Sequence, residues 1–489
     1  MPTWLREFLP ILLLLVAVGV VFARLPRIDM GHSVRYLSRR RWNWLPLGLT
    51  YAFLYMGRYN VKVSKFAFES LEHADGSSLM SNETFGVIFG VGTIVYGVSF
   101  LINGPLTDRY GGRFSILLGA FGAAIANLFM GLVSWSLWKQ GPGHQMFAAN
   151  FTVIFSVLYA INMYFQSFGA VAIVKVNSGW FHVRERGVFG AIFGILISLG
   201  IYFAFDWGDL ILKYLGLAWV FLVPAGLLLV FWVIDFFVVR NRPSEAGFED
   251  IPLGDATDGV EGPRRGALQV FGMMLRNPII LTIAAVEFCS GWLRQAIMQW
   301  FRTFAKQTDA VLGLKDSFVY DNWGLLLCIA GIMGGVVAGT ISDHVFQSRR
   351  GPVAALLYSV MLVCAVVMVF TYTQPWVGWL VIVMSLAVIG VHGMLSGTAS
   401  MDFGGSKNAG IAVGLIDGFV YLGTAAMSFT YAVILPREQI DAAGNITGPA
   451  ADPANWQAWP ISMVPLALIG LVMAWRIRNA KPKSQKQPA

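Results

Sequence analysis

The sequence is short of charge. Only 13% of its 489 residues are Asp, Glu, Lys or Arg, whereas 56% are hydrophobic. Soluble globular proteins carry about 25% charged residues and about 45–50% apolar residues, so the composition excludes a soluble protein and a disordered one. There are only three cysteines, Cys289, Cys328 and Cys364, and all lie within apolar runs. This excludes a disulfide scaffold and favours buried thiols over metal or redox chemistry.

The sequence also lacks the short motifs of common enzymes. It contains no Walker loop, no HExxH, no CxxC and no Ser-His-Asp order. ATP-driven transport and hydrolysis therefore have no support, and we expect neither an enzyme nor a cofactor. The net charge of +8 does not indicate nucleic acid, because basic residues in a polytopic membrane protein report its orientation.

Long hydrophobic runs dominate the sequence. A transmembrane helix needs about 20 apolar residues, and about thirteen segments meet that length. The sequence therefore predicts an all-α polytopic membrane protein. The expected spans are 4–23, 43–68, 84–106, 112–136, 148–172, 187–205, 217–239, 278–302, 320–341, 353–374, 376–398, 410–435 and 458–477.

The basic residues predict the orientation. The first span follows Arg6 and resembles a signal peptide, but cleavage would export the basic segment 24–41, against the positive-inside rule. We therefore predict an uncleaved helix with the N-terminus outside. With 24–41 inside, most of the 35 Lys and Arg residues fall on the cytoplasmic side, and so does the C-terminus. The expected location is a bacterial inner membrane.

The twelve other spans form an internal repeat. Each half has a lone arginine in its first span, Arg58 and Arg294, and a Gly-x-x-x-Asp turn after its second. Two six-helix bundles related by a pseudo-twofold axis, with substrate near the midplane, are the plan of major facilitator transporters. The expected domains are 1–41 (extra helix and basic linker), 42–240, 241–277 (cytoplasmic loop), 278–478 and 479–489 (cytoplasmic tail).

The two turns are candidate gating elements. The first matches every fixed position of the superfamily signature G-x-L-x-D-R-x-G-x-R, and its glycine permits close helix contact. The aspartate can hold basic loop residues in one conformational state and release them in the other. The alternative is that the basic turns only set topology. The candidates are Gly104, Asp108, Arg109 and Arg113 in the first half, and Gly339, Asp343 and Arg349 in the second.

Charges within the spans mark a candidate binding site. A charge at mid-membrane costs about 2.5–3.5 kcal/mol, so it indicates function. Tyr51, Tyr55, Arg58, Lys62 and Lys65 are spaced 4, 3, 4 and 3, which places them on one helical face. This stripe suggests a wet, positive cavity wall. The alternative is that the two lysines reach the outer interface and that Arg58 pairs with an acid.

Arg294 is the second candidate, with Glu287 seven positions earlier on the same face. A structural Glu287–Arg294 pair is the alternative reading and would weaken an anion site. Two arginines facing each other across the pseudo-twofold axis suit a small dianion, because the guanidinium fork binds phosphate through two donors.

From about residue 42 to 480 the chain resembles the organophosphate:phosphate antiporter family, which includes glycerol-3-phosphate and hexose-phosphate transporters. The resemblance implies that Arg58 and Arg294 bind phosphate and that Tyr51, Tyr55, Tyr96 and Gln166 line the cavity. The matching segments are 51–60 (Y-x-x-x-Y-x-x-R-x-N), 162–169, 180–187, 242–247, 339–350 and 407–410.

The sequence departs from relatives beside this site. A lysine in the second helix of some family members corresponds to Phe100, and a histidine in the fifth corresponds to Ile197. Lys62 and Lys65 are candidates to replace the missing charge, although they lie closer to the outside. Asp417, one turn before Tyr421, lines the cavity or caps helix contacts, and His392 is a buried histidine or a proton-coupling group.

The sequence thus predicts a secondary transporter in the lipid bilayer that exchanges a phosphorylated organic compound for inorganic phosphate by alternating access. We expect a monomer. One alternative is a membrane sensor that binds a sugar phosphate and acts through a partner. Another is proton-coupled uptake of a different organic anion.

Overall fold

The chain folds into a bundle of long helices. The computed structural model describes residues 30–73, 76–182, 185–253, 267–346, 350–441 and 445–479, with the single positions 15, 16 and 19. The expected first span at 4–23 lies outside these residues except at those three positions. Arg349 also lies outside them, as does the side chain of Asp343.

The first half begins with the longest helix, whose N-terminus is capped because the Ser33 side chain accepts a hydrogen bond from the Tyr36 backbone N–H. Its elements are α2 (Val34–Glu69), α3 (Asn82–Tyr110), α4 (Gly112–Lys139), α5 (His144–Ala149), α6 (Phe151–Ser178), α7 (Arg186–Tyr202), a π-helical turn (Phe203–Trp207), α8 (Gly208–Leu215) and α9 (Trp219–Val238).

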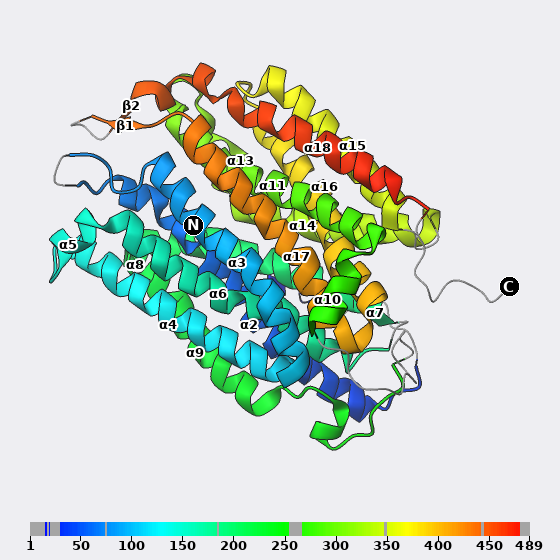
Figure 1. Ribbon diagram of the computed structural model, residues 1–489. Coiled ribbons are helices and arrows are strands. Elements are labelled where there is room, and N and C mark those ends of the chain that lie inside the picture. The colour runs from blue at the N-terminus through cyan, green and yellow to red at the C-terminus, as the bar shows by residue number, and fades with distance from the viewer. Residues whose placement is uncertain are drawn as a thin grey trace.

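The second half repeats this order after a short 3₁₀ turn (Pro243–Ala246). Its helices are α10 (Ala267–Leu275), α11 (Pro278–Gln307), α12 (Asp309–Leu312), α13 (Phe318–Asp321), α14 (Trp323–Thr340), α15 (Arg350–Thr371), α16 (Val377–His392), α17 (Ser400–Ile434) and α18 (Ala458–Arg476). Between α17 and α18, strands β1 (Gln439–Ile440) and β2 (Ile446–Thr447) pair antiparallel. In Figure 1 most first-half helices lie at the lower left and most second-half helices at the upper right.

Eleven helices in the described part of the chain are long and apolar enough to cross a membrane. They correspond to the third to thirteenth spans expected from the sequence. Helix α2, the second expected span, is not among the eleven. It is buried on every side from Thr50 to Lys65, as a helix in the centre of a large bundle is. With α2, the described residues form two sets of six long helices, as the sequence predicts.

The two halves meet closely along α3 and α17. Glycines make this approach possible. A Cβ atom added to Gly104 would lie 2.6 Å from the carbonyl oxygen of Gly410, and one added to Gly97 would lie 2.9 Å from that of Gly418. On the other side of the molecule, α7 of the first half packs against α14 of the second. Helices α2 and α11, which carry the two lone arginines, are thereby held inside the bundle.

Candidate functional site

Arg58 lies at the centre of the molecule with only 1% of its surface exposed. Its three donor groups contact three neutral side chains from three helices. Nε donates to Gln166 Oε1 at 3.0 Å, Nη2 donates to the Tyr96 hydroxyl at 2.7 Å, and Nη1 donates to the Tyr421 hydroxyl. None of these partners carries a negative charge, so the acid partner considered for Arg58 is not formed among the described residues.

Aromatic rings surround the guanidinium of Arg58. Its Cζ lies 4.4 Å from the ring centroid of Tyr55 and 4.5 Å from that of Tyr96. Tyr51 packs edge-on against Tyr55, with ring centroids 5.3 Å apart. The predicted stripe on α2 thus contributes both the cation and part of its aromatic wall, and rings facing a cation attract it.

Arg294 reaches the same site from the other half. Its guanidinium lies 5.8 Å from the ring centroid of Tyr421, while that of Arg58 lies 5.5 Å from the same ring. Arg294 is 2% exposed, and its Nε and Nη2 have no hydrogen-bond partner among the described residues. Donors that are buried without a partner are costly, so they favour a site that is completed by an acceptor from elsewhere.

Glu287 is not the partner of Arg294. Its Oε2 lies 3.1 Å from Nδ1 of His392 on α16, and both side chains are buried. The structural Glu287–Arg294 pair is therefore not formed among the described residues. Asp417 accepts a hydrogen bond from the Ser396 hydroxyl. Both acids lie within the second half, each with a partner of its own.

The backbone around Arg58 is held in place from α6. The Tyr159 hydroxyl donates to the carbonyl oxygen of Arg58 at 3.0 Å, and the Asn162 side chain donates to that of Gly57 at 2.9 Å. Asn127 of α4 links Asn162 to Asn60 of α2 through bonds of 3.0 and 2.5 Å. Buried amides in apolar helices need partners, and here they fix the height of Arg58 in the bundle.

Lys62 lies one helical turn beyond Arg58 toward the end of α2, and it is 3% exposed. Its ammonium donates to the Thr303 hydroxyl of α11, across the two halves. The rings of Phe85 and Trp300 lie 4.9 and 5.8 Å from its nitrogen. The alternative of a lysine reaching the outer interface does not fit this buried position.

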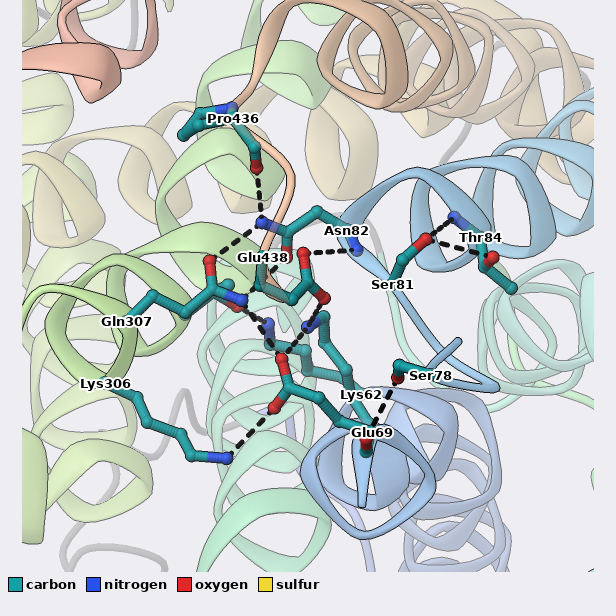
Figure 2. Close-up of polar contacts among 12 residues, drawn as sticks. Lys62, Glu69, Ser78, Ser81, Asn82, Thr84, Lys306, Gln307, Pro436 and Glu438 are labelled. Atoms are coloured by element: carbon teal, nitrogen blue, oxygen red, sulfur yellow. Dashed lines mark hydrogen bonds and ion pairs between the residues drawn. The ribbon is translucent and has the colours of Figure 1, made fainter. Parts of the chain in front are cut away.

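Beyond Lys62, the two halves are joined by a buried ion-pair cluster, here called the outer cluster (Lys65, Glu69, Asn82, Lys306, Gln307 and Glu438). Glu69 of α2 lies 3.2 Å from the Lys65 nitrogen and 3.0 Å from the Lys306 nitrogen of α11. In Figure 2 side chains from both halves turn toward Glu69. The cluster joins the two halves at the end of the bundle that the positive-inside rule predicts to face outside.

Further bonds in the outer cluster cross between the halves. Gln307 Nε2 donates to Glu69 at 3.1 Å, and Asn82 Nδ2 donates to Gln307 at 2.8 Å (Figure 2). Glu438 accepts from the Asn82 backbone N–H at 3.1 Å and lies 3.5 Å from the Lys65 nitrogen. Burial raises the pKa of the Glu438 carboxyl above its ordinary value, although the Lys65 charge opposes that rise.

At the opposite end, Asp108 of α3 contacts the second half. Its carboxylate lies 2.5 Å from the Lys175 nitrogen of α6 and accepts from the backbone N–H groups of Gly410 and Ile411 on α17 at 3.3 and 3.1 Å. The expected partners, the basic residues of its own turn, bind elsewhere. Arg113 donates to the Phe236 carbonyl oxygen and Arg109 lies over the Tyr110 ring.

The second turn differs from the first. Among the described residues, no heavy atom lies within 4 Å of a Cβ added to Gly339, whereas a Cβ added to Gly104 would meet Gly410. Asp343 lies in a π-helical turn (Ile341–Val345). The two turns share the Gly-x-x-x-Asp spacing, and the described contact of Gly104 has no counterpart at Gly339.

Several site residues carry little signal in the sequence. Tyr421 stands with Asp417 in an apolar helix, where an aromatic residue is ordinary, and only the fold places it against both arginines. The Gln307 and Glu438 contacts join residues more than 200 positions from their partners. The i, i+4 spacing of Lys65 and Glu69 is the one local sign of the outer cluster.

Comparison with known proteins gives a family match. Residues 47–428 match the family model described as the Major Facilitator Superfamily. The glycerol-3-phosphate transporter of Bacillus subtilis is 25% identical over 473 residues, which cover 91% of this chain and 95% of that protein. A probable hexose phosphate transport protein of Chlamydia pneumoniae is 23% identical over 422 residues, which cover 83% of this chain and 85% of that protein.

A third relative has a different description. The membrane sensor protein UhpC of Salmonella typhimurium is 26% identical, over 84% of this chain and 90% of that protein. Among solved structures, a bacterial homologue of the human lysosomal transporter Spinster matches with a TM-score of 0.63 at 13% identity, covering 94% of this chain and all of that one. That match supports the fold alone.

Proposed function

Because the chain belongs to the Major Facilitator Superfamily, a family of membrane transporters, we propose that it exchanges a phosphorylated organic compound for inorganic phosphate across a bacterial inner membrane. Relatives described as glycerol-3-phosphate and hexose phosphate transporters confirm the resemblance found in the sequence. They also support a phosphorylated substrate. The expected substrate class is glycerol 3-phosphate or a sugar phosphate.

One observation carries the proposal. Arg58 and Arg294 come from opposite halves, lie against the same ring of Tyr421, and have no carboxylate partner among the described residues. Two buried guanidinium groups without counter-charge are unfavourable, and a phosphate dianion between them would supply two negative charges and several acceptors. Lysine could not replace them, because it lacks the planar fork.

Coupling between the two substrates follows from this charge. A closed site with two uncompensated cations is costly, so the halves should interconvert readily only when a phosphate species is bound. Either inorganic phosphate or the organic phosphate meets the requirement, and exchange results. The outer cluster and the Asp108 contacts would then be the two closures that open in turn.

We also propose the orientation predicted from the basic residues, with the N-terminus outside and the C-terminus inside. A reporter fused to residue 1 should read as extracytoplasmic. A cytoplasmic reading would remove the extra helix from the count of spans.

The direct test of the function is counterflow. Purified protein in vesicles loaded with phosphate should take up labelled phosphate and then release it when glycerol 3-phosphate or a hexose phosphate is added outside. A second candidate function is a sensor, which the similarity to a membrane sensor protein favours. A sensor would bind the phosphate ester but would show no exchange.

A further inference from the structure

Two lysines of α2 stand in contrast. Lys65 is fully buried and has two carboxylates, Glu69 at 3.2 Å and Glu438 at 3.5 Å. Lys62 is 3% exposed and donates only to the Thr303 hydroxyl. Among the ion pairs formed by the described residues, no carboxylate approaches the Lys62 ammonium. A buried ammonium without an opposite charge is unfavourable, so the Lys62 side chain is a candidate to bind an anionic group.

Lys62 lies between the arginine site and the outer cluster along α2. It follows Arg58 by one turn on the same face of α2, about 6 Å along the helix axis. Its partner Thr303 lies on α11, nine residues after Arg294. The other cations at this end of α11 are neutralised, since Arg302 lies 2.7 Å from Asp209 and Lys306 lies 3.0 Å from Glu69.

The acids on both sides of Lys62 have other partners. Glu69 pairs with Lys65 and Lys306, and Glu438 pairs with Lys65. Glu287 lies seven residues before Arg294 on α11, away from Thr303, and its contact is His392. Asp417 accepts from Ser396. A phosphate held by Arg58 and Arg294 therefore leaves a third positive charge about one helical turn further along the interface.

One unpaired acceptor lies one helical turn before Thr303 on α11. Gln299 is on α11 between Arg294 and Thr303 in sequence, is fully buried, and its Oε1 has no hydrogen-bond partner among the described residues. An acceptor in that place suits a hydroxyl group on the carbon skeleton that joins two acidic ends.

We propose that Lys62 is a specificity-determining residue that binds a carboxylate on the organic part of the substrate, a few carbon atoms from the phosphate. This inference rests on the proposed function, because Arg58 and Arg294 hold the phosphate in it. The preferred substrate is then the phosphate ester of a hydroxy acid. Inorganic phosphate and uncharged esters use the two arginines and leave Lys62 unpaired.

Two esters with the same three-carbon skeleton test the inference. 3-Phosphoglycerate carries a carboxylate where glycerol 3-phosphate carries a hydroxymethyl group. In phosphate-loaded vesicles, the wild-type protein should take 3-phosphoglycerate at a concentration about 10- to 100-fold lower than glycerol 3-phosphate, as expected for one charge-assisted bond. Lys62→Gln should remove this preference, while Lys62→Arg should restore most of it.

The controls distinguish the proposed role of Lys62 from the proposed exchange of phosphate. In Lys62→Gln, the affinity for 3-phosphoglycerate should fall at least about tenfold more than the affinity for glycerol 3-phosphate, with exchange of phosphate for phosphate still measurable. Lys213→Gln, the same change of charge at an exposed site on α8, should alter neither ester. Equal loss of both esters in Lys62→Gln would make Lys62 a steering or structural charge and overturn the inference.

The wild-type protein also decides the question without any variant. Exchange of phosphate with no preference for 3-phosphoglycerate would overturn the role of Lys62 and leave the proposed function standing. Absence of phosphate exchange would overturn the proposed function, and the inference with it.

Discussion

Glu287 and His392 form a buried pair, with the carboxylate oxygen 3.1 Å from the imidazole nitrogen. The pair joins α11 to α16 within the second half. Because Glu287 pairs with His392, it does not pair with Arg294, seven residues further along α11. Two buried donors of Arg294 have no partner among the described residues. The positive charge of Arg294 is therefore available to a ligand.

A double-mutant cycle tests this arrangement. Ala substitutions at Glu287 and His392 should show a coupling energy of about 0.5–3 kcal/mol in thermal unfolding, because the two residues are in contact. The same cycle for Glu287 and Arg294 should give about 0.5 kcal/mol or less. A larger coupling between Glu287 and Arg294 would mean that Arg294 is a structural partner, and the phosphate site would have to be given up.

The outer cluster should hold the two halves together on the outside. Glu69→Gln removes the charge that pairs with Lys65 and Lys306. Reaction of an introduced Thr303→Cys with an impermeant maleimide added outside should then rise by at least about tenfold, a change of about 1.4 kcal/mol. The three native cysteines are buried, so the background should be low.

The matched control for Glu69→Gln is Glu83→Gln. Glu83 also pairs across the halves, with Arg437 at 2.6 Å, but that pair is solvent-exposed. An exposed pair contributes about 0–1 kcal/mol, so labelling should change by only a few-fold. Equal effects of the two substitutions would show that burial of the Glu69 pairs has no part in closure.

Glycine contacts predict a difference between the two signature turns. Gly104→Ala places a methyl group 2.6 Å from the Gly410 carbonyl oxygen, so α3 and α17 must separate. Overpacking of this kind costs about 1–3 kcal/mol, and exchange should slow by about tenfold. Gly339→Ala meets no atom of the described residues within 4 Å and should exchange at the wild-type rate. The rate of labelled phosphate exchange should be measured for both variants. A severe defect in Gly339→Ala alone would show that the second turn, and not the first, needs its glycine for close helix contact.

Asp108→Asn should affect rate more than binding. The amide keeps the shape of the side chain but loses the charge that pairs with Lys175 at 2.5 Å. We expect a phosphate exchange rate at least about tenfold lower, with a change in phosphate Kd below about threefold, measured by calorimetry on the purified protein. Should binding collapse while the exchange rate survives, Asp108 belongs to folding or to the site instead of to a gate.

Much of the architecture could be predicted from the sequence, for a physical reason. Apolar runs of membrane length are local, so the eleven long apolar helices of the described residues stand out one by one. The span at 43–68 was predicted from its apolar run as well, although its cations lower its hydropathy, and it lies within α2 (Val34–Glu69). The extra span at 4–23 stays a prediction.

The contacts of the site could not be predicted in the same way. Spacing identified Arg58 and Arg294 but could not show that Tyr421 lies against both, since that relation depends on how α17 packs. Glu287 was weighed as a partner for Arg294 because both share a face of α11, and the competing partner, His392, is 105 positions away. The partner of Asp108 could not be predicted either, because it pairs with Lys175 of another helix and not with the basic residues of its own turn.

The most direct measurement is labelled phosphate exchange in phosphate-loaded vesicles by the wild-type protein and by Arg58→Lys and Arg294→Lys. Each substitution keeps the charge and removes the planar fork, so phosphate binding should weaken by about 10- to 100-fold and exchange should nearly vanish, with the protein still folded. Wild-type uptake should require internal phosphate. Uptake into vesicles without phosphate, or exchange at the wild-type rate in either arginine variant, would contradict a two-arginine phosphate exchanger.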